Sequence, residues 1–103
     1  MFESCAELVS EYADLEQQLA DPAVHGDQTL ARKLGRRYAE LGPVVSSYKQ
    51  WLALTDDVTA ARELAAEDEA FAAELPSLIA AEAAAAEHLT TLLLPRDPMD
   101  DKD

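Results

Sequence analysis

The sequence predicts an all-α protein, an elongated antiparallel helical bundle or long kinked helical hairpin with coiled-coil-like packing. Ala, Leu and Glu are abundant among its 103 residues, whereas glycine, β-branched and aromatic residues are few, and such a composition favours helix. Apolar residues recur at spacings of three and four in three successive segments, as in helices that bury one narrow face. No segment shows the period-two alternation of a β-strand.

The first helix is expected close to the beginning of the sequence. Ser4 or Glu3 is expected to cap it. The stretch ADPAVHGD, residues 20–27, is expected to end it, because Pro22 cannot continue a helix and Gly26 suits a turn. Its apolar face consists of Cys5, Leu8, Tyr12, Leu15 and Leu19.

The second helical segment is expected from about residue 28 to residue 66, with Asp27 as its N-cap. Pro43 follows Gly42 and removes the hydrogen bond to the carbonyl of Ala39, so we expect one bent helix or two abutting helices. The apolar stripe consists of Leu30, Leu34, Tyr38, Leu41, Val45, Tyr48, Trp51, Leu54, Val58 and Ala61.

The third segment is expected to start near AAEDEA, residues 65–70, where acids favour a helix N-terminus. Pro76 predicts a kink or a restart, and the helix should end before Pro95. Residues 80–87, AAEAAAAE, combine high helix propensity with little bulk, so a neighbouring helix can approach closely. The face is formed by Phe71, Leu75, Leu78 or Ile79, Leu89, and Leu92 or Leu93.

Charge and cysteine content narrow the functional class. Twenty-one acids against eight bases give a net charge of −13, which repels nucleic acid and anionic membranes. Cys5 is the only cysteine, so no internal disulfide can form, and its place on an apolar seam favours a core residue over a nucleophile. The first 31 residues contain no Lys or Arg, and no apolar run suffices for a membrane span. We therefore expect a mature cytoplasmic protein.

No pattern in the sequence predicts a catalytic, metal or cofactor site. His25 and His88 lie 63 positions apart and are interpreted as a solvated turn residue and a helix-surface residue. The three glycines form no phosphate-binding loop. Abundant carboxylates are typical of a solvated helix face, and a thin bundle offers little room for an acid/base pair in a pocket.

Half of the eight bases lie in one short segment, RKLGRR at residues 32–37. Arg32, Lys33, Arg36 and Arg37 could contact RNA phosphates, or they could pair with the acids of the preceding helix, Glu7, Glu11 and Asp14; pairing is the commoner role of such clusters. Tyr38, Tyr48 and Trp51 lie at core spacing, which favours packing over base stacking.

Two stretches resemble a known family. RRYAELGPVVSSYKQW, residues 36–51, is similar to the N-terminal helical domain of bacterial class I peptide chain release factors. LLLPRDPMDDKD, residues 92–103, resembles the exit of that domain, most closely in the type that reads UAA and UAG, and LADPAV, residues 19–24, fits its first turn. The family usually has Lys at Arg96, Asn at Asp103 and a polar residue at Gly42.

The resemblance implies a non-catalytic domain at residues 1–94 and the start of a linker at residues 95–103. A downstream domain would carry a Gly-Gly-Gln loop that promotes peptidyl-tRNA hydrolysis, and a separate tripeptide would read the stop codon. The sequence contains no Gly-Gly-Gln, so the resemblance implies a truncated chain. Its implied partners are the rest of the factor and the ribosomal stalk base, built of rRNA and a ribosomal protein, with the four clustered bases as the candidate contacts.

Two other interpretations remain open at this level. A free-standing acidic helical adaptor or coiled-coil dimer would share the stripe of Leu8, Tyr12 and Leu15 between subunits. In that case the isolated domain would be a homodimer. A catalytic remnant acting through its carboxylates is the remaining alternative.

Overall fold

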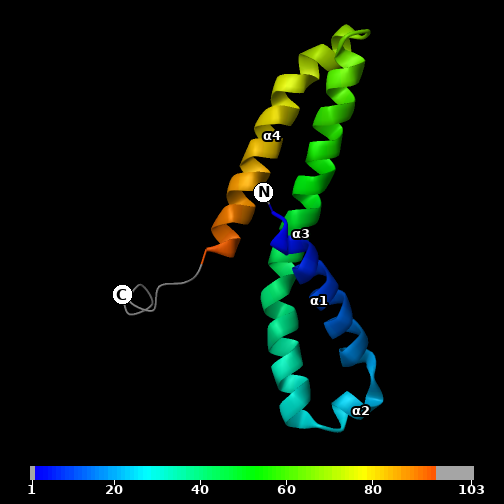
Figure 1. Ribbon diagram of the computed structural model, residues 1–103, viewed down its shortest axis with the longest axis vertical. Coiled ribbons are helices and arrows are strands. Elements are labelled where there is room, and N and C mark those ends of the chain that lie inside the picture. Colours follow the sequence, from blue (N-terminus) through cyan, green and yellow to red (C-terminus); the bar gives the residue numbers. More distant parts are fainter. Residues whose placement is uncertain (1, 95–103) are drawn as a thin grey trace, which may run out of the picture. The chain divides into compact units, whose positions relative to one another are not determined.

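The computed structural model describes residues 2–94, and within them it contains only α-helices and their connections (Figure 1). The helices are α1 (Ser4–Ala20), α2 (Pro22–His25), α3 (Gln28–Ala65) and α4 (Glu69–Leu93). The described part contains no β-strand, so the predicted all-α class is confirmed. The expected linker at residues 95–103 lies outside the described residues.

The chain divides into two compact units, Met1–Gln50 and Trp51–Asp103. The first unit contains α1, α2 and the beginning of α3, and the second contains the end of α3 and α4. Helix α3 therefore contributes to both units, and each unit is described by itself below.

Helix α1 begins where the sequence predicts, but Glu3 at its N-cap has helical dihedral angles and makes no capping hydrogen bond through its side chain. The short helix α2 was not expected. Asp21 caps it by accepting a hydrogen bond of 2.9 Å from the backbone N–H of Ala23 through Oδ1. Pro22 occupies the first helical position, where the missing N–H costs nothing and the fixed φ angle suits a helix.

Helix α3 resolves the alternative that the sequence left open, because it is a single helix that includes Pro43. Asp27 caps it as predicted, with Oδ1 accepting a hydrogen bond of 3.1 Å from the N–H of Leu30. Helix α4 likewise continues through Pro76. Asp68 caps α4, since its Oδ1 accepts a hydrogen bond of 2.9 Å from the N–H of Ala70.

The core of the first unit is made by α1 and α3. Leu15, Leu41 and Val45 are buried, and burying such a side chain contributes about 1.5–3 kcal/mol. Leu8, Val9, Tyr12, Leu34 and Tyr38 pack against these three in a partly buried shell. The stripe that the dimer interpretation would share between subunits is therefore used within one chain.

In the second unit, Val58 and Ala61 of α3 and Leu89 of α4 are buried. Leu78 is half-buried, whereas Ile79 is 37% exposed, which decides the alternative between these two neighbours. The sequence-based expectation was wrong for Leu30, which is 39% exposed. Periodicity identifies the apolar face of a helix, but it does not show whether another element covers that face at a given turn.

Candidate functional site

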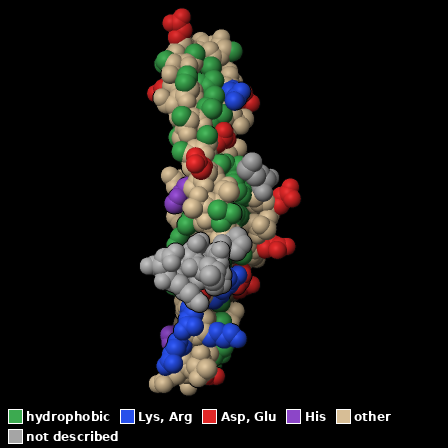
Figure 2. All heavy atoms as spheres, turned by 90° about the vertical axis from the view of Figure 1, so that its left-hand side faces the viewer, with side chains coloured by type: hydrophobic (Ala, Val, Ile, Leu, Met, Phe, Trp, Pro, Cys, Tyr) green, Lys and Arg blue, Asp and Glu red, His purple; other side chains and the backbone are tan. Residues whose placement is uncertain are grey.

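Three of the four clustered bases of α3 line one pocket, and the fourth, Arg37, is engaged by α1. Arg32, Lys33 and Arg36, with Thr29, line a shallow pocket of about 210 Å³ on the helix surface. Figure 2 shows Lys and Arg side chains gathered over this part of the first unit. Arg37 is not among the lining residues, because its guanidinium is directed to Glu11 of α1 and Glu40.

Arg37 instead forms an ion pair with Glu11 of α1. Its Nε donates a hydrogen bond of 2.6 Å to Oε2 of Glu11, and its Nη2 donates one of 2.9 Å to Oε1. Nη1 also lies 3.6 Å from Oε2 of Glu40, one turn along α3. The hydrogen bond from Arg37 holds the pKa of Glu11 below its ordinary value, and the same bond raises the pKa of Arg37. This fork geometry links α1 to α3 with a defined register.

A pair of stacked tyrosines also joins the two helices of the first unit. The rings of Tyr12 and Tyr38 are nearly parallel, with centroids 4.3 Å apart and an interplanar angle of 6°. A hydrogen bond with the Tyr12 side chain, followed by burial and the charge of Glu16, raises the pKa of Tyr38 to about 12. The rings stack on each other and pack against the core, as the core interpretation of Tyr38 predicts.

Gly42 lies beside Tyr12. A Cβ at Gly42 would lie 3.8 Å from the hydroxyl oxygen and 3.9 Å from Cε1 of Tyr12. That is ordinary van der Waals contact, so an alanine would fit here.

The three bases of the pocket are available to an external anion. Arg32, Lys33 and Arg36 are exposed, and within residues 2–94 they form no hydrogen bond or ion pair through their side chains. Cationic side chains one turn apart on a helix can contact successive phosphates of a nucleic-acid backbone, and the hydroxyl of Thr29 adds a neutral donor. Thr29 was not singled out from the sequence, although it lies three and four positions before Arg32 and Lys33.

The two histidines and the cysteine are the other reactive side chains that the sequence singles out. His25 and His88 are exposed, as predicted, although His25 is the last residue of α2 and not a turn residue. No group of three or more metal-ligating side chains occurs among residues 2–94. Cys5 is 1% exposed, and this burial raises the pKa of its thiol, so the side chain belongs to the interior. None of the helices described is long and apolar enough to cross a membrane.

Comparison with known proteins identifies related chains. The PCRF domain family matches residues 8–103. Peptide chain release factor 1 of Acidothermus cellulolyticus is 60% identical over 103 residues, which cover 100% of this chain and 28% of that protein. The proteins of the same name from Renibacterium salmoninarum and Streptomyces coelicolor are 57% and 54% identical, again over 100% of this chain and 29% of their own length.

The chain thus spans less than a third of the length of these curated relatives. No solved structure matches it significantly.

Proposed function

Because the chain belongs to the PCRF domain family and is similar to bacterial peptide chain release factors along its whole length, we propose that it is the N-terminal helical domain of a translation-termination factor, working in the cytoplasm. It catalyses no reaction in this proposal, and it helps to position the factor near the stalk base of the ribosome. Reading of UAA and UAG codons and promotion of peptidyl-tRNA hydrolysis are assigned to the rest of the factor.

The observation that carries the positioning role is the cationic face of Arg32, Lys33 and Arg36, which has no acidic partner within residues 2–94. The first unit, residues 1–50, contains eight acids and five bases, whereas residues 51–94 contain nine acids and one base. A phosphate backbone approaching this chain is therefore attracted at the beginning of α3 and repelled by the second unit. Contact with rRNA should be sparse, with the remaining contact made to protein.

This proposal changes the set of candidate ribosome contacts. Arg32, Lys33 and Arg36 are retained, and Thr29 joins them. Arg37 becomes a positioning residue, because its guanidinium is engaged by Glu11 and Glu40 and holds α3 against α1. It would orient the face without itself contacting phosphate.

The test compares two neighbouring arginines in the release factor expressed from its complete gene. Arg36→Ala and Arg37→Ala remove the same charge from adjacent positions, and only the first removes it from the proposed face. Removing one phosphate-binding cation should reduce the slope of log affinity against log salt by about 0.7–0.9. We expect Arg36→Ala to lower that slope for ribosome binding, and the triple variant Arg32→Ala, Lys33→Ala, Arg36→Ala to lower it by about 2–3.

Peptide release measured in a single turnover provides the second readout. With saturating factor, the triple variant should release at the normal rate, because the face acts in binding. An unchanged salt slope in the triple variant would show that the face does not contact phosphate.

The coiled-coil dimer remains the alternative for the isolated chain. Its seam is already packed in the chain, since Leu8 and Tyr12 lie against Leu15, Leu41 and Val45, so we expect at most weak self-association. Light scattering that shows a tight dimer at micromolar concentration would favour the adaptor interpretation.

A further inference from the structure

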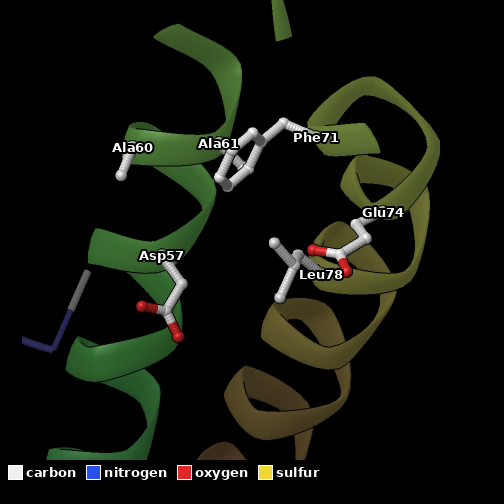
Figure 3. Close-up of a pocket in the computed structure, with 6 residues that line it drawn as sticks. All are labelled: Asp57, Ala60, Ala61, Phe71, Glu74 and Leu78. Atoms are coloured by element: carbon white, nitrogen blue, oxygen red, sulfur yellow. The ribbon is translucent and has the colours of Figure 1, made fainter. Parts of the chain in front are cut away.

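A second surface lies in the other unit, between the end of α3 and α4. A groove of about 290 Å³ is lined by Asp57, Ala60 and Ala61 of α3 and by Phe71, Glu74 and Leu78 of α4 (Figure 3). Figure 3 shows the side chains of Phe71 and Leu78 directed from α4 toward α3, with the carboxylates of Asp57 and Glu74 on either side of Leu78.

The sequence explains why a groove forms here. Asp57, Ala60, Ala61 and Leu64 follow the i, i+3, i+4, i+7 pattern and share one face of α3. Both alanines line the groove: Ala61 is 2% exposed and lies beside the ring of Phe71 in Figure 3, whereas Ala60 is exposed at the α3 edge of the groove. Phe71 and Leu78 are only half-buried, and Leu64 remains 41% exposed, so apolar surface in and beside the groove stays open to solvent.

The charge of the second unit is predominantly negative. Residues 51–94 contain nine acids and Arg62 as the only base. Neither Asp57 nor Glu74 has a hydrogen-bond or ion-pair partner among residues 2–94. The apolar floor is therefore bordered by two carboxylates that can receive cations from outside.

We propose that this groove binds a cationic amphipathic helix of another protein, which inserts an apolar side chain beside Phe71 and Leu78 and places Lys or Arg against Asp57 and Glu74. The volume is at or just below the lower end of the roughly 300–1,000 Å³ typical of small-molecule sites, so the groove suits single side chains of a docked helix better than an enclosed ligand. The charge of the second unit disfavours RNA and anionic membranes as occupants. This groove is a different site from the cationic face of Arg32, Lys33 and Arg36, and the proposal for the groove does not depend on that face.

A second copy of the chain is the competing occupant, because the segment from Leu30 to Arg37 is itself basic and exposes Leu30. Two copies each carrying a charge of −13 repel each other over distances comparable with the Debye length. A basic partner is attracted over the same distances, so charge complementarity favours a different protein.

The direct test uses the 103-residue chain and a synthetic helical peptide about four turns long, with Leu on one face and Lys on both flanks. A peptide with Glu in place of every Lys is its control. Binding is measured by calorimetry, and amide chemical shifts locate the peptide. We expect the Lys peptide to shift residues 57–61 and 71–78 and the Glu peptide to leave them unchanged.

Two matched pairs of variants separate the groove from general attraction to an acidic protein. Asp57→Asn with Glu74→Gln should weaken Lys-peptide binding about tenfold, whereas Glu82→Gln with Glu87→Gln removes the same charge outside the groove and should change it less than about threefold. Ala60→Leu should fill the groove and weaken binding about tenfold, while Ala84→Leu makes the same change at an exposed position of α4 and should not.

The outcomes are distinct. Equal weakening by both charge pairs, or full binding by Ala60→Leu with its circular dichroism unchanged, would overturn the proposal. A dimer in light scattering that Ala60→Leu abolishes would assign the groove to a second copy and would also overturn it. Neither outcome bears on ribosome binding through Arg32, Lys33 and Arg36.

Discussion

At the scale of single residues, the side chains of Arg36 and Arg37 have different roles although they are adjacent. The guanidinium of Arg37 is held by Glu11 in a two-bond fork, whereas that of Arg36 faces solvent in the cationic pocket. The sequence places four bases in one segment, but it does not show which of them α1 can reach. That depends on the rotation of α3 against α1, which is set by the packing of Leu15 against Leu41 and Val45.

The Glu11–Arg37 pair predicts a pH dependence of stability. The pKa of Glu11 in the folded chain is lowered from 4.5, mainly by the hydrogen bond from Arg37. The contribution of ionised Glu11 to folding stability is therefore fully present above the pKa that Glu11 has in the unfolded chain. It is lost as the pH falls through the lower pKa that Glu11 has in the folded chain. We expect Glu11→Gln to lower the thermal midpoint slightly at pH 7 and to have no effect in strong acid.

A double-mutant cycle with Arg37→Ala checks this assignment. Both partners are exposed, with side-chain accessibilities of 43% for Arg37 and 40% for Glu11, so the coupling should be small and should weaken with salt. Glu7→Gln removes an acid from the same helix and serves as the control. Additive effects of the two substitutions at pH 7 would show that the pair contributes nothing.

At the scale of helices, the chain tolerates proline in the interior of both long helices. Pro76 lies within α4 and Pro43 within α3, and each removes one backbone hydrogen bond and crowds the preceding turn. Around Pro76, Ala-rich segments with strong helix propensity maintain α4, whereas Pro43 has poor helix formers beside it and lies between Leu41 and Val45, which are packed in the core. The sequence shows that each proline should disrupt a helix, but it does not show whether the helix continues past the proline. Continuation depends on tertiary packing as well as on helix propensity.

Replacing Pro76 measures directly how much this proline destabilises α4. Its side chain is exposed, so Pro76→Ala should restore the hydrogen bond to the carbonyl of Ala72 without leaving a cavity. We expect the free energy of unfolding to rise by about 1–3 kcal/mol, measured by urea denaturation. Pro76→Gly restores the same N–H but carries a helix penalty of about 1 kcal/mol relative to Ala, so its gain should be smaller. A loss of stability in Pro76→Ala would mean that the fixed φ angle of proline matters more than the missing bond.

The helix that sequence reasoning missed, α2, shows where a local signal was present. Asp21 followed by Pro22 combines an N-cap residue with a proline suited to the first helical position, and the structure uses both in this way. We expected only a turn there, because the segment is too short to show any apolar period. The three longer helices were predictable, since each repeats its pattern over several turns.

At the scale of the whole molecule, charge is distributed unevenly between the two units. The cationic face of Arg32, Lys33 and Arg36 lies in the first, while the second has nine acids to one base among residues 51–94. The sequence alone shows this asymmetry, but only the helix pairing shows that apolar side chains border the acids Asp57 and Glu74 in one groove. The two proposals therefore assign an RNA backbone and a basic protein helix to two different surfaces of the chain.

The net charge of −13 predicts how the stability of the chain responds to salt. Repulsion among 21 acids outweighs the attraction to eight bases, so screening should stabilise the folded state at pH 7. Raising the ionic strength from about 0.01 M to about 0.15 M shortens the Debye length from about 30 Å to about 8 Å. We expect the thermal midpoint to rise by roughly 4–8 °C, which corresponds to about 1 kcal/mol for a domain of this size.

The control for this prediction is the same salt change near the isoelectric point of about 4.3, where net repulsion vanishes and the midpoint should hardly move. Sucrose at pH 7 separates screening from the general effect of excluded solutes, because it stabilises without acting on charges. A midpoint that falls with salt at pH 7 would mean that attractive pairs such as Glu11–Arg37 outweigh the repulsion. The folded chain would then be held together by its few bases, and their removal in the ribosome-binding variants would have to be corrected for reduced stability before any change in affinity is assigned to phosphate binding.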